Sequence, residues 1–202
     1  MIRLPGAEGK RGPIFEAALR VFARKGYHGA TVDDVASEAK VAKGTIYNYF
    51  KSKSDLFTQL YNEVEVPLWA GLERIKAEIP EPLDRIRMCF RFWCDTFAAF
   101  GEDAKVMVDI WANSCCQPGE HDEVRRCYLA SCQRVLREVR RDFEALRLAG
   151  RLRAGGSPEV LARAVSALFD GLLLQCIVEG ALDQLPKLGP ASLEIILAGA
   201  AP

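Results

Sequence analysis

Apolar residues recur along most of this chain at the spacing of one helical face, and this periodicity limits the possible folds more than any other feature. The first such stripe follows Pro13 and is ended by Gly26. Proline suits the first turn of a helix, and glycine commonly follows the last turn. No alternating, strand-like segment bounded by hairpin turns occurs in the sequence. The sequence therefore predicts an all-α fold.

The same reasoning, applied along the whole chain, predicts about nine helices. Thr31, Ser52 and Ser157 each stand where an N-cap residue is expected. Pro67 is expected to kink or end the fourth helix. The expected helices cover residues 13–26, 32–39, 43–50, 52–67, 83–100, 104–116, 120–149, 158–180 and 190–200.

The distribution of charge divides the chain into a basic head and an acidic body. The whole chain has a formal net charge of zero. Residues 1–53 carry ten lysines and arginines against five acidic residues, whereas residues 54–202 carry 17 against 22. A chance fluctuation is one explanation; the other is a head that meets phosphate. We therefore expect a DNA-binding domain at 1–53 and an effector-binding and dimerisation domain at 54–202.

The second and third expected helices have the dimensions of a helix-turn-helix. They are joined by the three residues Lys40, Val41 and Ala42. In this motif the second helix enters the major groove of double-stranded DNA and presents its N-terminal residues to base edges. The head is thus predicted to bind an operator.

The third helix, KGTIYNYF, has one face free for DNA if Ile46 and Phe50 point inward. Gly44 would let the backbone approach a duplex closely. Asn48 can pair with adenine through two hydrogen bonds, and Thr45 can meet a thymine methyl group or a phosphate. The alternative is that the tyrosines at 47 and 49 simply pack the head.

The run from Ile14 to Phe57 resembles the DNA-binding head of the tetracycline-repressor (TetR) family. The segment that carries the resemblance is TVDDVASEAKVAKGTIYNYFKSKSDLF. By this resemblance Thr31, Tyr47 and Lys53 hold phosphates, and the residues facing the groove are Lys43, Gly44, Thr45, Asn48 and Tyr49. Two positions depart from the family pattern. Lys40 stands where glycine is frequent, which implies a left-handed backbone, and Ala42 replaces a capping serine.

The last two expected helices are predicted to form a homodimer interface through residues 157–200. The segment ARAVSALFDGLLLQCIVEG is apolar on all sides, and its small residues allow close helix approach. A fully buried core helix would have a similar composition. Its most apolar stretch, 164–178, is interrupted by Asp170 and Gln175 and is expected to be too short to cross a bilayer.

The family resemblance also implies a small, apolar effector bound within the body. Aromatic residues are frequent from position 90 onward, although such residues at helical spacing also build ordinary cores. The candidate ligand-binding residues are Phe90, Trp93, Phe97, Trp111, Cys115, Phe169, Leu172 and Cys176.

Seven cysteines, with no C-x-x-C pair and no zinc-like spacing, indicate a reducing cytoplasm. No apolar signal segment follows the N-terminus. We expect no metal, no cofactor and no membrane association. Buried cysteine as a small hydrophobe is the default, and a thiol-responsive regulator is the alternative.

The main functional hypothesis is a dimeric, cytoplasmic repressor that an effector releases from DNA. A DNA-binding activator or a thiol-responsive regulator with the same head is the alternative. An enzyme is not expected, because the sequence offers no nucleophile–base pairing, no phosphate-binding glycine loop and no metal cluster.

Overall fold

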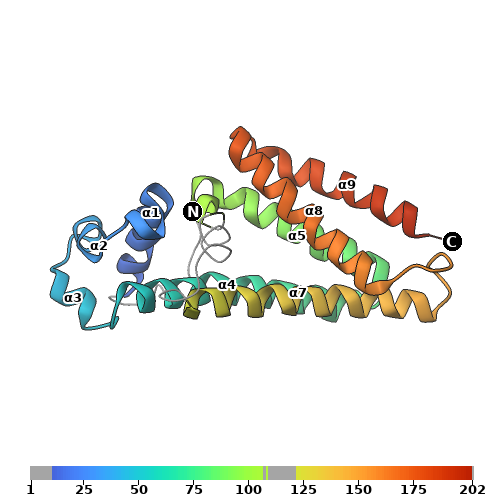
Figure 1. Ribbon diagram of the computed structural model, residues 1–202, viewed down its shortest axis with the longest axis horizontal. Helices are drawn as coiled ribbons and strands as arrows, with labels where there is room; N and C mark the ends of the chain where they lie inside the picture. The colour runs from blue at the N-terminus through green and yellow to red at the C-terminus, as the bar shows by residue number, and fades with distance from the viewer. Residues whose placement is uncertain (1–10, 107, 109–121, 202) are drawn as a thin grey trace. The chain divides into compact units, whose positions relative to one another are not determined.

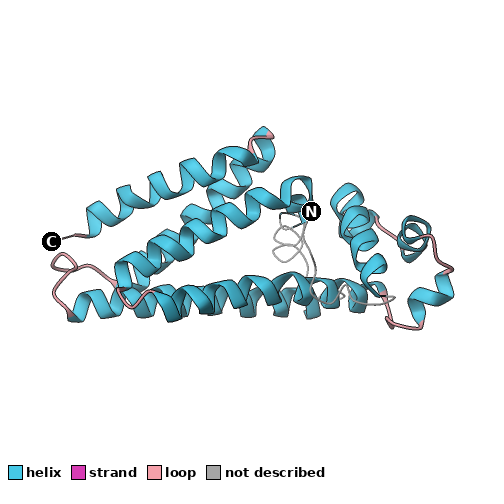
Figure 2. Ribbon diagram, turned by 180° about the vertical axis from the view of Figure 1, so that it is seen from behind, coloured by secondary structure: helices cyan, strands magenta, loops and turns pink. Residues whose placement is uncertain are grey.

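The computed structural model describes residues 11–106, 108 and 122–201, and these residues contain helices and no strands, as predicted (Figures 1 and 2). The expected helix at 104–116 lies largely outside the described residues. The α-helices are α1 (Gly12–Gly29), α2 (Val32–Ala39), α3 (Lys43–Tyr47), α4 (Lys53–Glu78), α5 (Pro82–Phe100), α7 (Asp122–Leu148), α8 (Pro158–Glu179) and α9 (Leu185–Ala200), with short 3-10 turns η3 (Gly101–Ala104) and η4 (Leu182–Gln184).

The chain divides into two compact units. The head unit contains residues up to 69 and the described residues from 102 to 130, and the body unit contains residues 70–101 and 131–202. Helix α4 contributes residues to both units, and the domain boundary at residue 53 stays a prediction.

The core of the head unit is built from aromatic side chains on α1 and α4. The rings of Phe22 and Phe57 meet edge to face at 4.9 Å between centroids, and Tyr27 meets Phe57 at the same distance. Phe15 contacts Phe50 at 5.4 Å, which joins the segment after α3 to α1. Edge-to-face pairs of this kind add to the stability from burial alone. The core therefore holds the helix-turn-helix on α1 and α4.

In the body unit α9 packs on α5 and α8. Two glycines allow close contacts there, one between α4 and α5 and the other between α9 and α5. A Cβ atom at Gly71 of α4 would lie 2.4 Å from the Phe92 ring of α5. A Cβ at Gly189 of α9 would lie 2.4 Å from Cys94 Sγ. Because real Cβ atoms do not approach so closely, a larger residue at either position would force the Phe92 ring or the Cys94 side chain, or the helices that carry them, to move.

Ion pairs fasten α7 to α4 and α5 within the body unit. Arg85 donates to Asp142 Oδ1 through Nε (2.9 Å) and Nη2 (2.5 Å), and its Nη1 donates to the Ile79 carbonyl (3.0 Å). Lys76 pairs with Glu138 at 2.8 Å. Both members of the Arg85–Asp142 pair are largely buried, so breaking it would leave a charge without compensation.

Pro67 does not end α4, which continues to Glu78, so that part of the prediction is wrong. Proline removes one backbone hydrogen bond. Val64, Leu68 and Leu72 nevertheless continue one buried face on both sides of it. Burial of these side chains outweighs the lost bond.

The final helix begins at Leu185, five residues before the predicted start at Pro190. Pro186 occupies its first turn, where no amide hydrogen is needed. Leu185, Gly189 and Leu193 are all buried at four-residue spacing. The helix therefore tolerates Pro190 in its interior for the same reason that α4 tolerates Pro67.

Helix α8 begins after Ser157, whose hydroxyl accepts from the Val160 amide, and ends at the left-handed Gly180, as predicted. With 22 residues it is long and apolar enough to cross a membrane by length and composition alone, so the expectation of too short a segment is wrong. Core helices of soluble proteins have the same composition. Much of α8 is uncovered by its own chain, however, with Val160 and Val178 63% and 77% exposed. It is therefore not a fully buried core helix.

Candidate nucleic-acid interface

The turn between α2 and α3 has the left-handed residue that the sequence predicts. Lys40 has φ 56° and ψ 42°, and its amide donates to the Ala36 and Ser37 carbonyls that end α2. It is the single non-glycine residue with positive φ in the described part of the chain. Ala42 makes no side-chain cap for α3, as its methyl group requires. The tight turn thus forms despite two residues that suit it poorly.

We expect Lys40→Gly to raise the free energy of unfolding by about 1 kcal/mol, because glycine avoids the Cβ–carbonyl crowding of the left-handed conformation. Urea denaturation followed by circular dichroism measures this change. Lys40→Ala is the control: it retains the Cβ and should give no gain. Equal stability of the two variants would contradict the argument.

Helix α3 places its predicted DNA-binding residues on its outer face. Ile46 and Phe50 are each 1% exposed, and so face inward as predicted. Gly44, Tyr47, Asn48 and Tyr49 are exposed and Thr45 is half-buried. The regular helix ends at Tyr47, but the Asn48 and Phe50 amides still donate to the Gly44 and Ile46 carbonyls. The outer face therefore continues beyond the helix as a turn.

Gly44 has no packing role in the protein itself. A Cβ atom added there would find nothing within 4 Å. A helix normally gains stability when an interior glycine is replaced. Packing within the head therefore does not require a glycine at this position.

The N-terminus of α2 is closed by a reciprocal capping box. Thr31 Oγ1 accepts from the Asp34 amide (3.1 Å), while Asp34 Oδ2 accepts from the Thr31 amide (3.0 Å) and hydroxyl (2.9 Å). Hydrogen bonds from Lys25, and then from Thr31, lower the pKa of Asp34 to about 2. The family resemblance implies that Thr31 holds a phosphate. Its amide and hydroxyl are here bonded to Asp34, although the residue is exposed.

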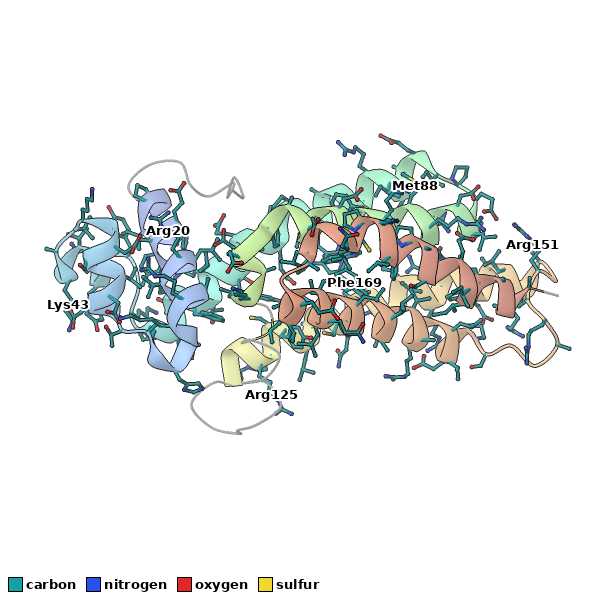
Figure 3. The ribbon with its side chains drawn as sticks, turned by 90° about the horizontal axis from the view of Figure 1, so that it is seen from above. Arg20, Lys43, Met88, Arg125, Arg151 and Phe169 are labelled. Atoms are coloured by element: carbon teal, nitrogen blue, oxygen red, sulfur yellow. The ribbon has the colours of Figure 1, made fainter. Side chains whose placement is uncertain are left out.

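The lysines around α3 differ in their surroundings. Lys43 is exposed (Figure 3), and its ammonium donates to Asp33 Oδ2 at 2.8 Å, which raises the pKa of Lys43. Lys51 is exposed. Lys53 is half-buried, and its ammonium donates to the Tyr27 carbonyl (2.8 Å) and the Ala30 carbonyl (3.0 Å). Of these three lysines, Lys43 and Lys51 present their charge at the surface near α3.

Four of the predicted effector residues meet in the body unit between α5 and α8. The Phe169 ring of α8 lies 5.3 Å from Phe97, 5.9 Å from Trp93 and 6.1 Å from Phe90 of α5 (Figure 3). Phe100, which was not among the predicted residues, joins this aromatic cluster through Phe97 at 5.1 Å. It could have been found as the residue one helical turn after Phe97.

The remaining predicted effector residues stand apart from these ring contacts or outside the described residues. Leu172 is half-buried and Cys176 is buried, one and two turns beyond Phe169 on α8. Trp111 and Cys115 lie outside the described residues. The described structure therefore brings together an aromatic subset of the predicted set.

The described cysteines are all free thiols. Burial raises the pKa of Cys89 to about 11 and that of Cys94 to about 12. Thiols with raised pKa values hold little reactive thiolate at neutral pH. Among the described residues no group of three or more potential metal ligands occurs. These observations favour a packing role for Cys89 and Cys94.

Two family models match the chain. Residues 14–60 match bacterial regulatory proteins of the tetR family, and residues 82–197 match the C-terminal region of BetI-type transcriptional repressors. The second match alone covers more than half of the chain. The helix-turn-helix and the helical body are thus each identified independently.

Individual relatives agree with the family models. The chain is 41% identical to the fatty acid metabolism regulator protein of Bacillus subtilis over 68 residues, which is 34% of this chain and 34% of that relative. It is 27% identical to the transcriptional regulator BetI of Paraburkholderia phytofirmans over 183 residues, covering 89% of this chain and 88% of BetI.

The fold is also that of SmeT, the repressor of the Stenotrophomonas maltophilia multidrug efflux pump SmeDEF. The two superpose with a TM-score of 0.77 at 23% identity, covering 97% of this chain and 92% of SmeT. SmeT has also been solved in complex with triclosan, and that structure matches with 24% identity, a TM-score of 0.77 and coverage of 95% and 91%. From its head, its body and its relatives, this chain belongs to the TetR family and is a DNA-binding transcriptional regulator.

Proposed function

We propose that this protein is a dimeric repressor in the bacterial cytoplasm that binds an operator through α3 and is released by a small apolar effector. The observation that carries the DNA-binding face is the outward position of Gly44 and Asn48 over a buried Ile46. Helices presented in this way enter the major groove in helix-turn-helix proteins.

The residues on this face suit different parts of a duplex. Asn48 offers two hydrogen bonds to adenine, and the half-buried Thr45 offers a methyl group and a hydroxyl. Lys43 and Tyr49 flank them at the groove. Tyr47, which is 48% exposed, and Thr31 would donate to phosphates, Thr31 by sharing the hydroxyl that bonds Asp34.

Operator binding is tested by fluorescence anisotropy with labelled DNA from the region flanking the protein's own coding sequence. We expect specific binding whose affinity falls about 1,000-fold between roughly 50 and 200 mM salt, as for proteins that neutralise several phosphates. An unrelated duplex of equal length is the control. An affinity that does not change with salt concentration, or that is equal for the two duplexes, would refute the proposed operator contact.

Dimerisation through α8 and α9 is the second part of the proposal. An apolar outer face, defined here as Val160, Ala167, Val178, Leu188, Ala191 and Ile195, is exposed on these two helices. Val178 and Ile195 are 77% and 76% exposed. A second copy of the chain would cover this face and set two heads at the spacing of two operator half-sites.

The effector would bind at the aromatic cluster of Phe90, Trp93, Phe97, Phe100 and Phe169. SmeT binds triclosan, a small aromatic molecule, in the same fold, and an aromatic site favours ligands of this kind. Because the cluster bridges α5 and α8, a ligand inserted among its rings would change the packing of a helix in the proposed dimer interface. Such a ligand can release DNA only if it binds the DNA-free conformation of the protein more tightly than the DNA-bound conformation.

A further inference from the structure

A closed series of contacts surrounds the turn that joins α3 to α4. The guanidinium of Arg11, the N-cap residue of α1, lies 5.3 Å from the centroid of the Phe50 ring and donates through Nη2 to Gln59 Oε1 on α4. Gln59 Nε2 donates to Asp55 Oδ1 at 2.7 Å, and Asp55 Oδ2 accepts from the Lys51 amide at 2.7 Å. Since Phe50 and Lys51 are consecutive residues, the contacts return to the point where they began.

The Lys51 amide finds its hydrogen-bond acceptor on α4. The backbone bonds that prolong α3 end with the Phe50 amide, which donates to the Ile46 carbonyl at 2.9 Å. The next amide, that of Lys51, donates to the Asp55 carboxylate instead. Asp55 is itself held, because its own amide donates to the Ser52 hydroxyl at 3.0 Å. The backbone at Lys51 is therefore fastened to the first turn of α4.

Gln59 is the type of residue that this arrangement requires. Its amide oxygen accepts from a cation and its amide nitrogen donates to a carboxylate, so the two partners fix which way the amide group is turned. An ionised glutamate could accept from Arg11 but could not donate to Asp55. Burial acts to raise the pKa of Asp55, but hydrogen bonds from Gln59 and from the Lys51 amide outweigh it and lower the pKa. Asp55 is therefore a charged acceptor at neutral pH.

Lys51 carries its charge close to the outer face of α3. It follows Asn48 by three residues and is exposed. The ion pairs of lysines in the head involve Lys25, which binds Asp34, and Lys43, which binds Asp33. Exposed lysines beside a helix that enters the major groove commonly bind DNA phosphates. A phosphate is thus the group that the Lys51 ammonium suits.

We propose that Gln59 and Asp55 are positioning residues: together they hold the turn after α3 so that Lys51 meets a phosphate of the operator. Gln59 acts on the Asp55 carboxylate, and Asp55 acts on the backbone of Lys51. This inference rests on the proposed DNA-binding face, because the position of Lys51 matters for binding only if α3 meets the duplex.

A double-mutant cycle tests the coupling between Gln59 and Lys51. Lys51→Met is made in the unaltered protein and in a Gln59→Met variant, and operator affinity is measured over a series of salt concentrations. In the unaltered protein Lys51→Met should lower the salt slope by about 1.8, one phosphate contact for each head of a dimer, and reduce affinity about tenfold. In the Gln59→Met variant the slope should already be lower, and Lys51→Met should reduce affinity less than about threefold. An equal loss in the two backgrounds would overturn the proposal.

Hydrogen exchange separates positioning from a general loss of structure. Affinities are measured at a temperature where circular dichroism shows Gln59→Met to be folded, and in this variant exchange should accelerate at the Lys51 amide but not at the Ile46 amide. Gln133→Met, at an exposed position of α7, is the control and should change neither the exchange nor the effect of Lys51→Met. Unchanged exchange at the Lys51 amide in Gln59→Met would also contradict the proposal. Absence of salt-dependent binding by the unaltered protein would instead refute the proposed function.

Discussion

Gly44→Leu is expected to abolish high-affinity operator binding while leaving the protein folded. A side chain at this position meets nothing within 4 Å in the protein, so leucine should be tolerated and should even favour the helix by up to about 1 kcal/mol. In the complex the same side chain would occupy the space into which the duplex must come. We expect affinity to fall more than about 100-fold, because both heads of a dimer lose contacts worth about 1–3 kcal/mol each.

The measurement combines thermal unfolding with anisotropy against the operator. Ala77→Leu, which adds a similar side chain at an exposed position of α4, is the matched control and should bind as the unaltered protein does. If Gly44→Leu retained full affinity with a normal melting temperature, α3 could not lie against DNA through this face.

Ile195→Asp is expected to convert the dimer to monomers. Ile195 is 76% exposed on the apolar outer face of α8 and α9, so a polar substitution costs the isolated chain little. In a dimer formed through this face each copy would bury an unpaired carboxylate, at a cost of several kcal/mol per charge. Sedimentation equilibrium should show the dimer dissociation constant rising at least about 100-fold, and operator affinity should fall with it.

Leu148→Asp provides a close control for this experiment. Leu148 is also 76% exposed, but it ends α7 and lies outside the apolar outer face. The Leu148→Asp substitution should therefore leave the dimer intact. Dimers that survive Ile195→Asp but dissociate with Leu148→Asp would place the interface elsewhere.

The head shows how far local sequence signals reach. Thr31, Lys40 and the inward pair Ile46 and Phe50 act within a few residues of their own positions, through capping, backbone conformation and helical period. For that reason the helix-turn-helix and the outward face of α3 could be predicted. The start of α9 could not, because Pro190 by itself is a signal for the first turn of a helix, and only the burial of Leu185 and Leu193 shows why the helix begins before it and continues through it.

The contacts of Lys53 lie beyond such local reasoning. Nothing in residues 51–55 indicates that its ammonium will reach carbonyls 26 and 23 residues earlier, and the pairing of Arg85 with Asp142 is equally hidden from local sequence. Likewise, aromatic residues at helical spacing could not reveal which of them would meet; the packing of α5 on α8 decided that Phe97 contacts Phe169.

The sequence by itself determined the all-α class, the helix-turn-helix and its exposed residues, because these depend on interactions along one helix. The tertiary structure alone decided where α4 and α9 begin or end and what Lys53 binds. The helix bounds and the Lys53 contacts depend on side-chain burial and on partners that folding brings close. The free energy of burying several side chains amounts to several kcal/mol, which outweighs local helix preferences of about 1 kcal/mol per residue.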